Sequence, residues 1–139
     1  MSITRLDQVE LGDELPEEQP DVSLETVRRF VKASEMDFPR FTDHEYARAE
    51  GLPGAVIPGI MSQGQLAAMI HRWAPGSTVV KMDTLFRSPM VVGTTVVCRG
   101  AVTGLNDDGT IEIDLTIISE ASGATGVLGT ATVRLANGP

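Results

Sequence analysis

The sequence has little of several features that would narrow its function at once. Its single cysteine, Cys98, excludes a disulfide within the chain and fits a reducing compartment. It has no uninterrupted apolar run of the length that crosses a bilayer, and no basic segment followed by an apolar one at its start. We therefore expect a cytoplasmic protein with no membrane partner.

Histidine is also scarce, which limits the chemistry that the chain can support. The two histidines, His44 and His71, lie far apart and have no carboxylates around them at the spacing of metal ligands. Ser62 and Ser88 have no base at a recognisable spacing, and no glycine-rich loop of the phosphate-binding kind is present. The sequence therefore predicts no metal site and no cofactor.

Positive charge is missing from one part of the chain. Eight acidic residues and no Lys or Arg lie between Asp7 and Glu25, and the net charge of the whole sequence is −8. An acidic chain without a basic stripe repels phosphate backbones, so we expect no nucleic-acid partner. The remainder is close to neutral and is compatible with a small phosphorylated ligand such as coenzyme A. Its contacts would come from a cluster including Arg72, Lys81, Arg87 or Arg99, unless these are solvated surface charges.

The hydrophobic pattern predicts one α+β domain over residues 1–139. Helices are expected over 24–34, from Asp43 to Gly51, and from Gly59 to about Trp73. The last of these is apolar around most of its girth, so it should be wrapped by other elements. Alternating segments then predict an antiparallel sheet curled around this helix, with strands near 78–86, 94–104, 110–119 and 126–135.

One segment, Glu35–Asp43, resembles the Gly-Asp-x-Asn-Pro-x-His-x-Asp motif of the MaoC-like, R-specific enoyl-CoA hydratases. Pro39 and Asp43 match without a gap. The catalytic Asp of the motif falls on Met36, its Asn on Phe38 and its catalytic His on Phe41. The stretches Val56–Met61 and Phe86–Pro89 are similar to two further family motifs. The resemblance implies a single hot-dog domain, in which an antiparallel sheet wraps around one long central helix.

The resemblance also implies where an acyl thioester would bind. Pro58, Gly59 and Ile60, at the start of the long helix, are expected to bind the substrate. The Gly59 N–H would hold the thioester oxygen, as a free helix N-terminus is suited to do. Alternatively, Gly59 only closes the turn after Pro58. Met36, Phe38 and Phe41 are expected to line the acyl slot, or else to fill it and close it.

Proton transfer is the part of the chemistry that the substituted motif has lost. Neither Met nor Phe can transfer a proton, and Asp37 is the one local carboxylate that a shifted loop would bring to the site, unless it is a solvated loop residue. Asp43 is expected to cap a helix, and His44 to lie at the surface.

Three hypotheses follow from the substituted motif. The first is an acyl-CoA or other acyl-thioester binding subunit that shapes the substrate pocket of a heteromeric enoyl-CoA hydratase or dehydratase and relies on a catalytic hot-dog partner. The second is a divergent homodimeric hydratase that uses Asp37. The third is a hot-dog protein that binds or acts on a natural-product intermediate.

Overall fold

The α+β class is confirmed by the computed structural model, which describes residues 2–137. A short 3-10 turn, η1 (Leu6–Gln8), precedes the helices α1 (Leu24–Ala33), α2 (Pro39–Thr42), α3 (His44–Ala49) and α4 (Gly59–Trp73). The strands β1 (Thr78–Phe86), β2 (Val96–Leu105), β3 (Ile111–Ser119) and β4 (Thr125–Arg134) then form an antiparallel sheet in the order β1-β4-β3-β2.

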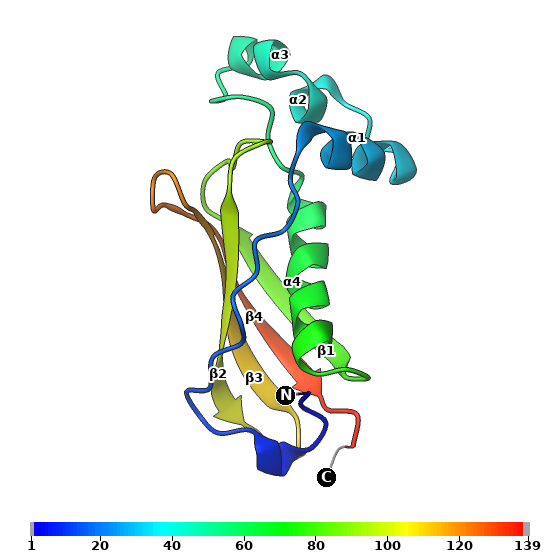
Figure 1. Cartoon of the computed structure of the whole chain (residues 1–139), viewed down its shortest axis with the longest axis vertical. Helices are drawn as coiled ribbons and strands as arrows, with labels where there is room; N and C mark the ends of the chain where they lie inside the picture. Colours follow the sequence, from blue (N-terminus) through cyan, green and yellow to red (C-terminus); the bar gives the residue numbers. More distant parts are fainter. Residues whose placement is uncertain (1, 138–139) are drawn as a thin grey trace.

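The long helix α4 lies along one face of the curved sheet, and α1, α2 and α3 sit together beyond one end of the strands (Figure 1). The N-terminal arm runs beside β2 and pairs with it through the bridges Glu14–Ala101 and Glu18–Cys98. Because α4 begins at the end that carries the short helices, its N-terminus faces them (Figure 1).

The core forms between α4 and the inner face of the sheet. Side chains on β3 alternate as predicted: Ile113 and Leu115 are buried toward the helix, and Asp114 between them is exposed. Leu66 and Ile70 of α4 are fully buried against this face. Burial of these aliphatic side chains is the main favourable contribution to folding.

The sheet curls over one side of α4, as predicted, and leaves the opposite side of the helix open within residues 2–137. The side of α4 opposite the sheet carries Ile60, which is 55% exposed, and Gly64 and His71, which are also exposed. The sheet covers only the side with Leu66 and Ile70, because one curved layer cannot surround a helix. Within residues 2–137 no helix has both the length and the apolar character needed to cross a membrane.

The predicted helix caps are confirmed. The Ser23 hydroxyl accepts a hydrogen bond from the Thr26 N–H at 3.3 Å, and the Asp43 carboxylate accepts one from the Tyr46 N–H at 3.0 Å. Gly51 ends this region with φ of 92°, a left-handed conformation that glycine adopts without strain. The additional helix α2, which starts at Pro39, lies inside the segment that carries the substituted motif.

Cys98 is buried in β2, with 1% of its surface exposed, and this burial raises the pKa of its thiol to about 12. We expect the native protein to resist alkylation by iodoacetamide at about pH 8, just below the ordinary thiol pKa, and the urea-unfolded protein to react. Mass spectrometry of the two samples measures this difference. Equal labelling in both would contradict the buried position of Cys98.

The same burial gives a pH dependence of stability with a definite sign. The pKa of Cys98 in the folded protein lies above its ordinary value of 9.0. The buried thiol therefore makes its full contribution to the free energy of unfolding below about pH 9. It is lost as the pH rises toward 12, because the unfolded chain releases the proton first. Urea unfolding should therefore show the native chain losing stability relative to Cys98→Ala as the pH rises from about 9 to 12, whereas below about pH 9 the difference between the two should not change with pH.

Candidate functional site

The N-terminus of α4 opens into a pocket of about 520 Å³. Pro58 caps this helix without any side-chain hydrogen bond, and the first α4 N–H with a backbone acceptor in residues 2–137 is that of Ser62, which donates to Pro58 O at 3.2 Å. The N–H groups of the first turn, beginning at Gly59, are thus available to a ligand. They carry the positive end of the helix dipole, which favours an oxygen with negative charge.

Gly59 lets the aromatic ring of Phe86 approach the start of α4 closely. A Cβ at this position would lie 2.8 Å from Cζ of Phe86, so the aromatic ring at the end of β1 rests directly against the glycine. The ring and the helix start together form one wall of the pocket. An alanine here would have to displace the exposed ring of Phe86, so glycine allows this packing and also leaves its N–H accessible to a ligand.

The chemistry of the pocket is set by its lining, which contains neither a carboxylate nor an imidazole. Its charged side chains are Arg40 and Arg87, its hydroxyls are Ser62 and Ser88, and the rest is mostly apolar: Phe41, Leu52, Val56, Ile57, Gly59, Phe86, Pro89, Met90, Gly126 and Val127. An arginine stays protonated and an unassisted serine is a poor base, so this lining binds anions and apolar groups but does not transfer protons.

The predicted acyl-slot residues are divided between two pockets. Phe41 lines the α4 pocket, but Met36 and Phe38 line a neighbouring cup of about 400 Å³ together with Pro39, Arg40, Phe41 and Tyr46. The ring centroids of Phe38 and Phe41 are 6.4 Å apart. The α2 segment Pro39–Thr42 therefore separates Met36 and Phe38 from Gly59, and only Phe41 and Arg40 border both spaces.

The remaining predicted site residues have other positions. Pro58 is buried as the N-cap of α4, whereas Ile60 belongs to the exposed side of the helix and lines neither pocket. Asp37 borders a depression of about 290 Å³ with Arg28, Lys32 and Thr42. The structure therefore places Asp37 beside the cations of α1 and not among the residues of the α4 pocket.

His44 has a structural role that the sequence did not reveal. The expectation of a surface histidine is wrong, because the side chain is half-buried and its Nδ1 accepts a hydrogen bond from the Ala55 N–H at 3.0 Å. This bond ties α3 to the turn that leads into α4. Gly54 makes the contact possible, since a Cβ there would lie 3.0 Å from His44 Nδ1.

Three of the four candidate phosphate ligands form ion pairs with acidic side chains. Arg72 pairs with Glu18, Lys81 with Asp83 at 3.4 Å, and Arg99 with Glu17 at 2.8 Å. Arg87 is the member of this set that lines the α4 pocket, and no ion pair involves it within residues 2–137. Of these four side chains, Arg87 is the one positioned to contact an anionic ligand there.

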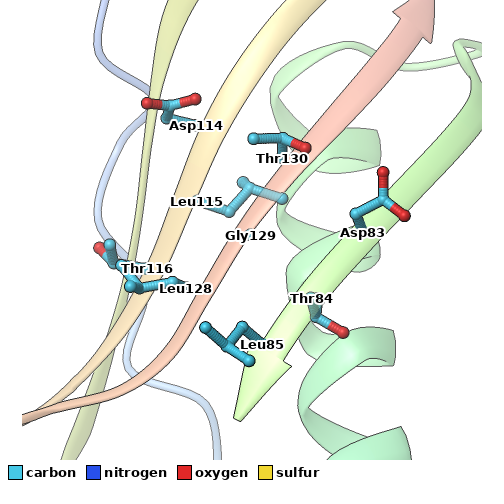
Figure 2. Close-up of a pocket in the computed structure, with 9 residues that line it drawn as sticks. All are labelled: Asp83, Thr84, Leu85, Asp114, Leu115, Thr116, Leu128, Gly129 and Thr130. Carbon is cyan, nitrogen blue, oxygen red and sulfur yellow. The ribbon is translucent and has the colours of Figure 1, made fainter. Parts of the chain in front are cut away.

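A second concavity, of about 430 Å³, lies on the sheet face opposite α4 (Figure 2). Asp83 of β1 and Asp114 of β3 stand on either side of Thr130 of β4 in this view. Asp83 is paired with Lys81, and Asp114 adds a negative charge that disfavours a phosphate or a developing oxyanion. No group of three His, Cys, Asp or Glu side chains among the described residues could hold a metal ion.

The sheet and its helix define the hot-dog fold. The chain is similar to the (R)-hydratase from A. caviae involved in PHA biosynthesis, with a TM-score of 0.85, 22% identity, and coverage of 91% of this chain and 97% of that one. It is also similar to the ChsH1-ChsH2 complex from Mycobacterium tuberculosis, with a TM-score of 0.83, 20% identity, and coverage of 91% and 98%.

A MaoC-like dehydratase gives a TM-score of 0.87 at 24% identity, over 95% of this chain and 42% of that one. The sequence matches no protein-family model and no curated protein. The predicted hot-dog fold is thus confirmed, and its solved neighbours include R-hydratases and MaoC-like dehydratases. At these identities the likeness establishes the fold, so the function has to be argued from the pocket.

Proposed function

We propose that this chain binds acyl thioesters and shapes the substrate pocket of a heteromeric enoyl-CoA hydratase or dehydratase without supplying the acid or the base. One observation carries the proposal: the α4 pocket keeps a free helix N-terminus at Gly59, yet its lining has no carboxylate and no imidazole. The free helix N-terminus can bind a thioester and stabilise an oxyanion. Proton transfer needs a carboxylate or an imidazole, which the pocket lining does not contain.

The geometry suggests how a thioester would bind. Its carbonyl oxygen would accept a hydrogen bond from the Gly59 N–H, where the helix dipole favours the negative charge that develops on an enolate-like oxygen. The apolar side chains Ile57, Phe86 and Val127 would contact the acyl group. Exclusion of water by these side chains strengthens the hydrogen bond, because the local dielectric falls.

A second chain would complete the active site. The exposed side of α4 presents the apolar side chain of Ile60, with Gly64 one turn further on, next to the binding site. A homodimer would leave every pocket without an acid–base pair, whereas a partner hot-dog chain with the intact Asp and His would supply one. The similarity to the ChsH1-ChsH2 complex supports such a pairing, because that complex contains two different subunits.

Arg87 provides the first test of ligand binding. We expect Arg87→Ala to weaken binding of a short acyl-CoA about tenfold, because a charge-assisted hydrogen bond to a phosphate is lost. Isothermal titration of the purified chain at two salt concentrations measures the change, and the variant should also show a weaker salt dependence.

Arg99→Ala is the matched control for this titration. Arg99 is an exposed arginine held by Glu17 on the arm side of β2, away from the α4 pocket. Its removal should leave acyl-CoA affinity unchanged. Equal losses in both variants would show that net charge, and not Arg87, governs binding, and no binding by the native chain would refute the proposed function itself.

A further inference from the structure

The segment that leads into α4 is held by a histidine that can act only in its neutral form. The backbone N–H of Ala55 donates to His44 Nδ1 at 3.0 Å. Because a backbone N–H can only donate, Nδ1 must carry a free lone pair, and the proton of the neutral imidazole must lie on Nε2. Protonation of His44 places a hydrogen on Nδ1 as well, so two donors then face each other.

The burial of Ala55 makes this conflict unfavourable. Ala55 has 0% of its surface exposed, so water cannot replace the lost acceptor while the segment stays in place. A buried N–H without an acceptor destabilises the conformation that contains it. Protonation of His44 therefore favours a conformation in which residues 54–57 move away from α3 and the Ala55 N–H reaches solvent.

The segment that His44 holds forms part of the α4 pocket, because Val56 and Ile57 line it. Within residues 2–137, the other hydrogen bonds of residues 54–57 join backbone groups. The Val56 N–H donates to Arg40 O at 2.9 Å, and the Ile57 N–H donates to Met90 O at 2.9 Å. Backbone amides do not change charge near neutral pH, so the His44 contact is the proton-sensitive hydrogen bond of this pocket wall.

The charges around the imidazole leave this hydrogen bond as the main difference between its two protonation states. Residues 54–57 and 90–92, which lie against each other beside His44, contain no titratable side chain. The other titratable side chains of α2, α3 and the ends of α3 are all exposed to solvent: Arg40, Asp43, Glu45, Tyr46, Arg48 and Glu50. Solvent and salt screen exposed charges, so these groups act only weakly on His44.

We propose that His44 is a proton-sensitive positioning residue for the α4 pocket. In its neutral form it holds residues 54–57 in the conformation that binds a ligand. Its protonation, as the pH falls from about 7.5 to 5.5, releases this wall and weakens the binding of acyl thioesters. Histidine is the side chain that ordinarily changes charge between about pH 5 and 8. The effect on binding rests on the proposed function, whereas the effect on the wall does not.

The first measurement needs no ligand. In ¹H–¹⁵N spectra of the labelled native protein, the Ala55 amide proton should move upfield on acidification, with the same midpoint as the His44 imidazole, because its hydrogen bond is lost. In His44→Asn the side-chain oxygen takes the place of Nδ1 and does not titrate, so the Ala55 signal should stay constant. A constant Ala55 signal in the native protein would overturn the proposal, whatever the protein binds.

The second measurement follows the affinity for butyryl-CoA by isothermal titration. The native chain should bind about fivefold more weakly at pH 5.5 than at pH 7.5, which corresponds to the loss of one hydrogen bond. His44→Asn should show a smaller change. Protonation of the ligand itself affects both proteins equally, so the difference between them reports on His44.

His71→Asn is the matched control, because His71 is the other histidine of the sequence and lies on the exposed side of α4 near its C-terminal end. It should keep the full pH dependence of the native chain. Equal changes in the native chain and in His44→Asn would overturn the link between His44 and the pocket while leaving the proposed function standing. No binding by the native chain at pH 7.5 would overturn the proposed function, and the effect on binding with it.

Discussion

Purified by itself, the chain is expected to hydrate a short enoyl-CoA no faster than buffer does. Acid–base catalysis by positioned side chains contributes about 10²- to 10⁴-fold to such reactions, and the α4 pocket has no group that can provide it. Loss of the enoyl-thioester absorbance, followed with a MaoC-type hydratase as positive control, measures the rate. In the proposed binding mode the Gly59 helix start would polarise the thioester without delivering a proton.

Asp37→Asn separates this expectation from the alternative of an active homodimer. Asp37 borders the depression with Arg28 and Lys32, so the variant should behave like the native chain. Clear hydration by the native chain, abolished in Asp37→Asn, would instead establish Asp37 as the catalytic group. A rate that appears only when a hot-dog chain with the full Asp and His motif is added would support the heteromer.

Gly129→Ala is expected to destabilise the protein by about 3 kcal/mol, as overpacking in a tight structure does. A Cβ at Gly129 would lie 2.8 Å from the backbone oxygen of Asp83 and 3.1 Å from Cγ2 of Thr84. Figure 2 shows these residues on the adjacent strands β4 and β1. Backbone cannot move aside as a flexible side chain does, so β1 must shift away from β4. Urea unfolding measures the loss.

Gly64→Ala is the matched control for this effect. Gly64 lies on the exposed side of α4, and a Cβ there would meet nothing within 4 Å. Alanine is favoured over glycine inside a helix by about 1 kcal/mol, so this variant should be more stable than the native chain. Equal destabilisation by both substitutions would show that the cost at Gly129 is not the clash with β1.

The elements that the sequence predicted well are those with local signals. Alternation on β3 depends only on neighbours two residues apart, and the caps at Ser23 and Asp43 depend on contacts within one helical turn. The start of α4 at Gly59 was also visible, because Pro58 and a glycine mark it. These features were therefore predictable without knowledge of the tertiary structure.

The features that the sequence did not reveal depend on contacts between distant segments. The expected slot of Met36, Phe38 and Phe41 assumed that these side chains face Gly59 together, whereas α2 divides them between two pockets. The hydrogen bond between His44 and the Ala55 N–H crosses an irregular turn, where the spacing of hydrophobic residues gives no information. In the same way, only the folded chain shows which arginines the acidic N-terminal arm neutralises.

The N-terminal arm has a further consequence for how copies of the chain associate. By pairing with β2 through Glu14 and Glu18, the arm covers that edge of the sheet, and among residues 2–137 the edge strand without a neighbour is β1. A sheet with open edges on both sides can add strands indefinitely and grow into a fibre. A sheet with one open edge joins one other sheet and then stops, so assembly through this edge ends at a pair.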